Sequence, residues 1–265
     1  VDSDMKQLVD DMKGGNISAL IIINANPAYD YFNNKDFTDG LKNVKLSISC
    51  NDRLDETSSL CTYNCPDSHY LESWNDAEPK MGMYSITQPC ISPLFHTRQV
   101  GDSLLNWMSS SDDYYTYIKN CWNKYGFPNQ KKYKSFQDMW DNCVRLGVGD
   151  WDVPEYKKYS FDNKNLGTAS AVGNMSSKGL ELVMYEKIGA GNGRYANNPW
   201  LQELPDPVSK VTWDNYACLN PETAKSMDLI DGDWVKVTVK NNSVELPVVV
   251  QPGQNKDRPN PRPRQ

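Results

Sequence analysis

The sequence lacks any apolar run close to the roughly 18 to 20 residues that cross a bilayer as a helix. Hydrophobic residues nevertheless make up 38% of its 265 residues, which is enough to bury a core. We therefore expect a folded globular protein with no membrane-spanning segment of its own.

The sequence also lacks an initial methionine and the apolar stretch of a signal peptide, since it begins at Val1 and continues with mostly polar residues. We expect it to have been cut from a longer protein. An excess of basic residues is missing as well, because the formal net charge is −6 and the pI is near 5.0. A nucleic-acid partner needs clustered Lys and Arg, so we expect none.

Cysteine and histidine patterns offer little chemistry. The seven cysteines are an odd number, which argues against a disulfide framework, and the three-residue spacing of Cys61 and Cys65 fits neither a zinc ribbon nor an iron–sulfur cluster. The four cysteines that we interpret as small buried apolar residues are Cys61, Cys65, Cys90 and Cys218. His69 is followed by Glu72 and Asp76, and a structural hydrogen bond is favoured there over hydrolase chemistry.

The first third of the chain has an alternating helix and strand pattern. Apolar spacing predicts a helix over residues 3–13, a buried strand over 18–23, a brief helix at Phe37 and Leu41, and a second buried strand over 44–49. Ligands of parallel sheets bind beyond the carboxyl ends of strands, which places Asn24, Asn26, Asn51 and Asp52 at the potential binding edge. For Asn24 and Asn26 the alternative is a loop capped by its own side chains.

The middle of the chain changes in character. The run Asp55-Glu56-Thr57 can open a helix, residues 68–98 look like a long loop, and residues 102–108 again have a helical pattern. Residues 109–174, rich in Tyr, Lys, Asn, Asp and Trp, indicate an inserted lobe with helices over 114–124 and 136–146.

The last third is predicted to be mainly β. Residues 179–187 have strand character, and the strands 234–239 and 244–250 are joined tightly enough to form a hairpin, as in a small barrel or sandwich. Gly189, Gly191 and Gly193 lack a following helix pattern that would receive a diphosphate, so we interpret them as a flexible loop. The Pro- and Arg-rich end should be disordered.

Four passages have distinctive sequences: LIIINANPAYD at 20–30, DETSSLCTYNCPDSHYLESWNDAEP at 55–79, QPCISPLFHTRQVGDSLLNW at 88–107, and 191–237 with its NPWLQELPDP string and Asp231-Gly232-Asp233. Together they resemble the molybdopterin oxidoreductase superfamily, and more narrowly the large iron–sulfur subunit of bacterial alternative complex III. The Gly-Asp pattern is typical of the whole superfamily, whereas HYLESW and NPWLQELPDP are more specific.

The resemblance implies an α/β fold: a Rossmann-like parallel-sheet layer at 1–110, a mostly helical insertion at 111–175, a partial double-psi β-barrel at 176–253 and a disordered tail at 254–265. It implies the C-terminal part of an oxidoreductase subunit that is not itself catalytic and has no cofactor or metal ligand of its own. If a molybdopterin guanine dinucleotide binds, the matching contacts are Asn24, Asn26, Pro27, Asn51, Glu56 and Thr57.

By the same resemblance, the partners are the other subunits of a membrane-bound, quinol-oxidising respiratory complex. Iron–sulfur clusters are expected elsewhere in the full-length subunit. The expected location is peripheral, on the periplasmic side of the bacterial inner membrane. The alternative is the dinucleotide-binding part of an active molybdenum oxidoreductase.

Overall fold

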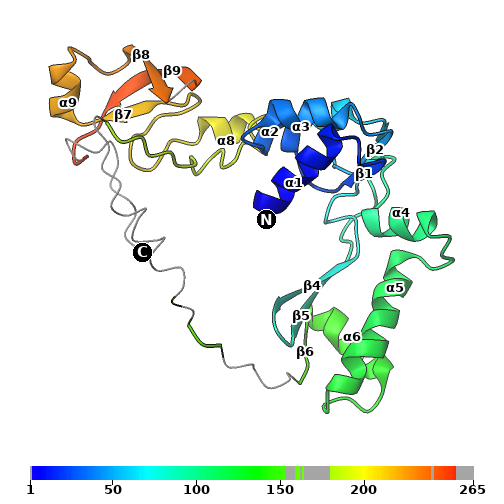
Figure 1. The fold of residues 1–265 in the computed structure, drawn as a ribbon. Helices are drawn as coiled ribbons and strands as arrows, with labels where there is room; N and C mark the ends of the chain where they lie inside the picture. The colour runs from blue at the N-terminus through cyan, green and yellow to red at the C-terminus, as the bar shows by residue number, and fades with distance from the viewer. Residues whose placement is uncertain (1, 153–158, 162, 164–179, 240–241, 255–265) are drawn as a thin grey trace. The chain divides into compact units, whose positions relative to one another are not determined.

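The computed structural model describes residues 2–152, 159–161, 163, 180–239 and 242–254. The chain divides into two compact units, Val1–Lys158 and Tyr159–Gln265. Both are drawn in Figure 1, where the first unit runs from blue to green and the second is mainly yellow to red. Within the described residues, no helix is both long and apolar enough to cross a membrane.

The first unit begins with a parallel sheet and its crossover helices. The helix α1 (Asp2–Lys13) precedes β1 (Ala19–Ile22), and the helices α2 (Pro27–Asp30) and α3 (Asn34–Leu41) lead to β2 (Leu46–Ser49). A 3-10 helix η1 (Ser58–Leu60) then leads to β3 (Tyr63–Asn64), and all pairing in the order β1-β2-β3 is parallel. This arrangement confirms the predicted helix–strand alternation and the parallel sheet.

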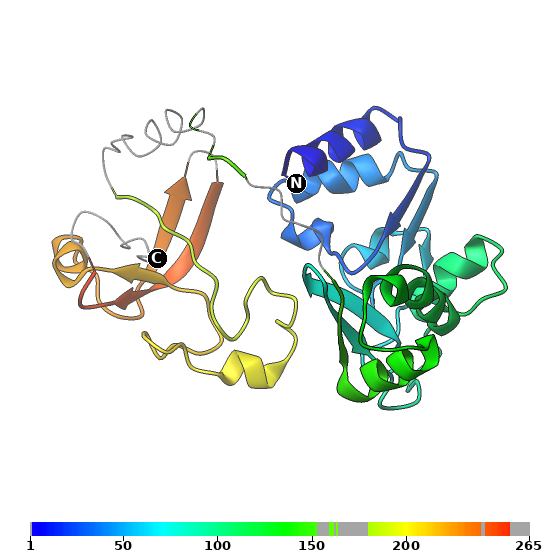
Figure 2. The ribbon, with the colours of Figure 1, turned by 90° about the horizontal axis from the view of Figure 1, so that it is seen from below.

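One face of this sheet is covered by helices. Figure 2 shows α1 and α3 side by side, and their apolar faces meet the sheet in one core. The buried residues of that core are Val9, Met12, Ile22, Phe37, Leu41 and Val44. The prediction that residues 18–23 are buried on both faces is wrong, because Ile21 and Ile23 are each 43% exposed. Side chains alternate along a strand, so these two point away from the face that α1 and α3 cover.

A second, antiparallel sheet follows in the same unit. The strands β4 (Asn75–Lys80) and β5 (Met83–Thr87) form a hairpin, and β6 (Val148–Asp150) pairs with β5. The predicted loop over 68–98 is therefore wrong across this hairpin. The sequence hides it because β4 is polar and contains Pro79, at the point where the register of the pair shifts. The pairing of β5 with β6, which is distant in the sequence, stabilises this hairpin, and no local sequence pattern predicts that pairing.

The helices between β5 and β6 enclose an aromatic core. The helices that contribute side chains to it are α5 (Tyr114–Cys121), the π-helix η2 (Trp122–Gly126), the 3-10 helix η3 (Phe127–Asn129) and α6 (Phe136–Leu146), and α4 (Val100–Trp107) precedes them. This confirms the two helices predicted at 114–124 and 136–146. Trp122 is 1% exposed and Trp140 is 2% exposed, with their rings edge to face at 5.5 Å between centroids. The strand β5 contributes Tyr84 and Ile86 to the same core, and Trp74, directly before β4, packs against it.

The second unit contains a mixed sheet. Its strands β7 (Ala217–Leu219), β8 (Trp234–Val239) and β9 (Asn242–Val250) lie in the order β7-β9-β8, with β7 parallel and β8 antiparallel to β9. The predicted hairpin is confirmed as β8 and β9. Two short helices, α8 (Pro199–Glu203) and α9 (Pro221–Ser226), precede it. The described strands do not settle closure into a double-psi β-barrel, so that detail stays a prediction.

Two further predictions for the described residues of this unit are wrong. Residues 180–186 are not a strand, because the only pairing recorded nearby in the described residues is the bridge between Lys187 and Gly191; Gly179 lies outside the described residues. Gln254, assigned to the disordered tail, is 8% exposed and its carbonyl accepts a hydrogen bond from Asn220. The rest of that tail, 255–265, lies outside the described residues.

Candidate functional site

The loops that follow β1 and β2 meet at one edge of the parallel sheet, where the sequence placed the binding site. Asn24 directly follows the predicted strand and has a φ of 51°, a left-handed conformation that Asn tolerates better than most residues. Cys50 and Asn51 follow β2, and the Cys50 N–H donates to the carbonyl of Ile22 at 2.8 Å. The parallel register therefore brings the two loops together.

Asn51 joins the two loops through its side chain. Its Oδ1 accepts a hydrogen bond from the Ala25 N–H at 3.2 Å, and its Nδ2 donates to the Ala25 carbonyl at 2.8 Å. The same Nδ2 donates to the Asp55 carboxylate at 2.7 Å. Asn51 is 6% exposed, so its amide is occupied inside the protein. The other Asp55 oxygen accepts from the Ser58 N–H and caps the turn that begins η1.

Asn26 and Thr57 form a second link between the loops. The Asn26 Oδ1 accepts from both the N–H of Thr57, at 3.1 Å, and its hydroxyl, at 2.7 Å, while the Asn26 Nδ2 donates to Glu56 at 2.7 Å. The Thr57 hydroxyl also accepts from the Ala28 N–H at 3.0 Å, and the residue is 0% exposed. Asn26 stands at the N-cap of α2 but makes no capping hydrogen bond, because its amide serves Thr57 and Glu56.

The six predicted contacts therefore separate into two groups. The side chains of Asn26, Asn51 and Thr57 connect the two loops by hydrogen bonds. For Asn26, this favours the interpretation of a loop capped by its own side chains over ligand contact. Pro27 is half-buried at the start of α2, and Asn24 and Glu56 are exposed. That the six residues hold a pterin dinucleotide stays a prediction, although three of them already have hydrogen-bond partners within the loops.

The sequence missed Asp55 and Ser58 as members of this network. The Ser58 hydroxyl lies 2.7 Å from that of Ser49 on β2, and both residues are buried. A local signal was present, because an Asp side chain often caps a turn by accepting a hydrogen bond from the backbone N–H three residues later. Asp55 and Ser58 have this spacing.

The geometry around His69 does not support acid–base catalysis by this residue. The His69 N–H donates to the Glu72 carboxylate at 3.0 Å, and the His69 Nδ1 accepts from the Leu71 N–H at 3.3 Å. Asp76 accepts instead from the Trp122 indole at 2.7 Å. His69 thus has the local structural role that the sequence favoured, and in the described part of the chain no group of three or more His, Cys, Asp or Glu could hold a metal ion.

The glycines at 189, 191 and 193 lie in a turn. Gly191 and Gly193 have positive φ, and a Cβ on Gly189 would lie 2.7 Å from the carbonyl oxygen of Leu201. The expectation that no helix follows is wrong, because α8 begins at Pro199 behind an Asn198 cap. The sequence hid this helix because it has only five residues, too few for an apolar period. Gly189 allows close packing of this turn on α8, whereas Gly191 and Gly193 allow its positive φ angles.

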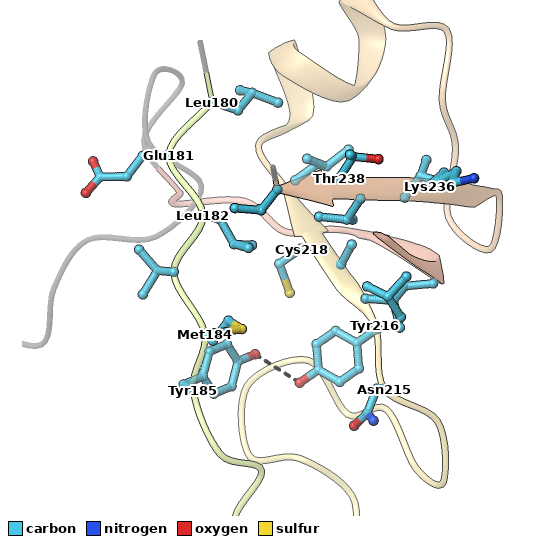
Figure 3. A pocket seen from close by; sticks show the side chains of 18 of the residues that line it. Leu180, Glu181, Leu182, Met184, Tyr185, Asn215, Tyr216, Cys218, Lys236 and Thr238 are labelled. Atoms are coloured by element: carbon cyan, nitrogen blue, oxygen red, sulfur yellow. Dashed lines mark hydrogen bonds between the residues drawn. The ribbon is translucent and has the colours of Figure 1, made fainter. Parts of the chain in front are cut away.

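The second unit contains a cavity of about 810 Å³ that sequence reasoning missed. It lies between the extended residues 180–187 and the sheet β7-β9-β8, and Figure 3 shows side chains from both sides pointing into it. Most of the lining is apolar, contributed by residues such as Leu182, Val235 and Leu246. The size and lining are typical of pockets that bind small molecules.

Polar groups gather at one part of the cavity. The hydroxyls of Tyr185 and Tyr216 lie 3.1 Å apart, as the dashed line in Figure 3 shows, and Ser209 donates to Tyr216 at 2.8 Å. The Cys218 thiol donates to the Gln251 side chain at 3.1 Å. Burial, followed by the hydrogen bond with Tyr216, raises the pKa of Tyr185, and burial raises the pKa of Cys218. These groups are protonated at neutral pH, so they suit hydrogen bonding rather than proton abstraction.

Residues 182–258 match the family described as Molydopterin dinucleotide binding domain. The chain is similar to the menaquinone reductase, molybdopterin-binding-like subunit, of Nitratidesulfovibrio vulgaris, with 33% identity over 91 residues, which is 33% of this chain and 13% of that protein. It is also similar to the acetylene hydratase of Syntrophotalea acetylenica, with 20% identity over 271 residues, covering 87% of this chain and 34% of that protein.

Among solved structures, the acetylene hydratase from Pelobacter acetylenicus matches with a TM-score of 0.53 and 16% identity, covering 95% of this chain and 38% of that one. At this identity the likeness concerns the fold alone. The chain spans about a third of the length of the acetylene hydratases, and less of the menaquinone reductase subunit.

Proposed function

We infer a function from the membership of this chain in the molybdopterin oxidoreductase superfamily, of which it contains a dinucleotide-binding-type domain. We propose that it serves as a structural module of a quinol-oxidising electron-transfer complex, of the alternative complex III type. In this proposal it belongs to a molybdopterin-oxidoreductase-like subunit and has no redox centre of its own.

The main support for this proposal is that the loops after β1 and β2 are held together by hydrogen bonds between their own groups. A loop that holds a dinucleotide needs side-chain donors facing the ligand, whereas Asn51 and Thr57 are buried and Asn26 is engaged by Thr57 and Glu56. Breaking those bonds to reach a ligand would leave polar groups of Ala25 and Ala28 without partners, which is costly inside a protein. The network instead favours a rigid edge that positions neighbouring parts of the fold.

The proposed setting follows from the relatives. One relative is named as a molybdopterin-binding-like subunit of a menaquinone reductase, which is consistent with a respiratory complex of several subunits. We propose that the other subunits of such a complex are the partners, that iron–sulfur clusters are held elsewhere in the full-length subunit, and that the module lies peripherally on the periplasmic side of the inner membrane.

A second candidate is the dinucleotide-binding part of an active molybdenum oxidoreductase. The match of residues 182–258 to a dinucleotide-binding family favours it, as does the exposure of Asn24 and Glu56 at the strand ends. In that case the cofactor would supply the redox chemistry. The Asn24 amide would be the hydrogen-bond donor, and the Glu56 carboxylate would accept hydrogen bonds from amino groups of the ligand.

The test is metal and pterin analysis of the full-length subunit purified from native membranes with its complex intact. Molybdenum, tungsten and iron are measured by mass spectrometry, and pterin by the fluorescence of its oxidised form. The structural proposal expects iron in the complex and neither pterin nor molybdenum or tungsten at stoichiometric amounts. Stoichiometric pterin with molybdenum or tungsten would overturn it.

Variants of the loop residues then distinguish a role in binding the cofactor from a purely structural role. Asn24→Gly removes the amide and keeps the left-handed backbone, and Glu56→Gln removes the charge. If the second candidate holds, both variants lower the bound pterin, whereas Asn34→Ala, on the exposed start of α3, does not. If the structural proposal holds, pterin stays below stoichiometry in all of these proteins.

A further inference from the structure

Two cysteines stand opposite each other at the end of the parallel sheet. The register pairs Ser49 with Asn64, and Cys50 and Cys65 are the next residues along the two strands. The Cys65 N–H donates to the Ser49 carbonyl at 2.8 Å, and the Asp67 N–H approaches the Asn51 carbonyl at 3.4 Å. Cys50 and Cys65 therefore lie across from each other, one residue beyond the last assigned pair of the two strands.

The geometry of that pairing is compatible with a covalent link. Neighbouring strands lie about 4.8 Å apart, which is within the roughly 4.4–6.8 Å that separate the Cα atoms of disulfide-bonded cysteines. Lateral partners on parallel strands project from the same face of the sheet. Burial raises the pKa of Cys50, and the neighbouring Cys65 thiol and Asp67 carboxylate add to the effect, which agrees with their proximity.

We propose that Cys50 and Cys65 form a reversible disulfide that locks the strand-end loops of the first unit. Both are free thiols in this structure. The oxidant is a protein or small-molecule disulfide that reacts by thiol–disulfide exchange. This modification is independent of whether the loops hold a cofactor.

The order of the exchange follows from exposure. Cys65 is partly exposed, whereas Cys50 is 1% exposed. The Cys65 thiolate attacks the incoming disulfide, forms a mixed disulfide and releases one thiolate of the oxidant. The Cys50 thiolate then attacks the sulfur of Cys65, forms the internal bond and releases the second thiolate. The oxidant gains two electrons, and the two protons of the cysteine thiols end on its sulfur atoms.

The other cysteines lie in different surroundings. Cys61, although close to Cys65 in sequence, packs against the core formed by α1, α3 and the sheet. Cys143 belongs to the aromatic core, and Cys218 donates to Gln251 in the second unit. Cys90 is exposed, which corrects the expectation that it is a buried apolar residue. An exposed loop thiol needs no apolar contact, so the sequence offered no signal for its position.

The bond would act on the candidate loop directly. Cys50 precedes Asn51, whose side chain joins the two loops, and Cys65 precedes the segment whose Asp67 anchors the start of α4. Asp67 accepts from the Val100 N–H at 2.8 Å and from the Ser68 N–H at 2.9 Å. Oxidation would therefore tie the end of β2 to the segment that leads to α4.

The experiment uses the folded full-length protein and oxidised glutathione as the probe. After incubation the protein is unfolded in iodoacetamide and digested, and its peptides are analysed by mass spectrometry. We expect peptides with Cys50 joined to Cys65, and the loss of both of these sites from the alkylated set. The urea midpoint of the oxidised protein should rise above that of the reduced protein.

Cys65→Ser is the informative variant, because the partly exposed site tolerates it better than the buried Cys50. It should abolish the cross-link and the rise in urea midpoint, whereas Cys90→Ser should leave both intact. The proposal is overturned if Cys50 and Cys65 both remain alkylated while Cys90 carries glutathione. It is equally overturned if Cys65 is found joined to Cys61.

Discussion

Asn51 is the residue on which the strand-end loops depend most. Its amide satisfies both backbone groups of Ala25 and one oxygen of Asp55, and almost none of it reaches solvent. Removing a buried partner costs more than an average hydrogen bond contributes, because the remaining groups are left desolvated and unpaired. The residue thus acts as a structural bridge between the loops after β1 and β2.

We expect Asn51→Ala to lower the free energy of unfolding by roughly 2–3 kcal/mol. The same change at exposed Asn34 should cost less than about 0.5 kcal/mol. Urea unfolding followed by circular dichroism measures both. Equal effects at the two positions would contradict the role assigned to Asn51.

At the scale of elements, the π-helix η2 depends on a glycine. Gly126 closes this helix, and a Cβ there would lie 2.3 Å from the Trp151 ring. Its φ of −86° suits any residue, so the requirement for glycine is purely steric. The Trp151 ring in turn stacks on Tyr84 with 3.6 Å between centroids, which connects η2 to the hairpin β4–β5.

Gly126→Ala should therefore destabilise the aromatic core by about 1–3 kcal/mol through overpacking. A double-mutant cycle with Trp151→Ala tests whether the clash with Trp151 is the cause. In the Trp151→Ala protein, Gly126→Ala should lower the free energy of unfolding much less, because the large ring is absent. Unfolding free energies of the four proteins provide the measurement. If the glycine substitution costs the same in both backgrounds, the clash with Trp151 is not its cause.

For the whole molecule, the main feature is that each unit has a core of its own. Val1–Lys158 contains the helix–sheet core and the aromatic core, and Tyr159–Gln265 contains the buried Ala224 and Val248. Two units that each bury their own side chains predict two unfolding reactions, since a substitution acts on the cooperative unit that contains it.

Scanning calorimetry of the full chain should therefore resolve two transitions. Met139→Ala, at a position that is 1% exposed, should lower the midpoint of one of them, with a cost of about 2–5 kcal/mol. Val248→Ala, also at a position 1% exposed, should lower the other. A single transition that both variants shift by the same amount would show that the chain unfolds as one unit.

The sequence by itself determined the elements whose signals are local. Period and composition predicted α1, β1, β2, α5, α6 and the hairpin of β8 and β9, because each holds an apolar pattern within a few residues. The specific strings HYLESW and NPWLQELPDP sufficed for the superfamily. The position of the strand-end loops also followed, since parallel strands end at one edge.

Only the tertiary structure decided how those loops are used. That Asn26 accepts from Thr57, and that the Asn51 side chain bonds to the Ala25 backbone, depends on contacts across about thirty residues of sequence, which no local pattern encodes. The hairpin β4–β5 depends likewise on β6, and the pairing of Cys50 with Cys65 on the strand register. In each case the physical reason is the same: the partner is distant in sequence and becomes a neighbour only when the sheets form.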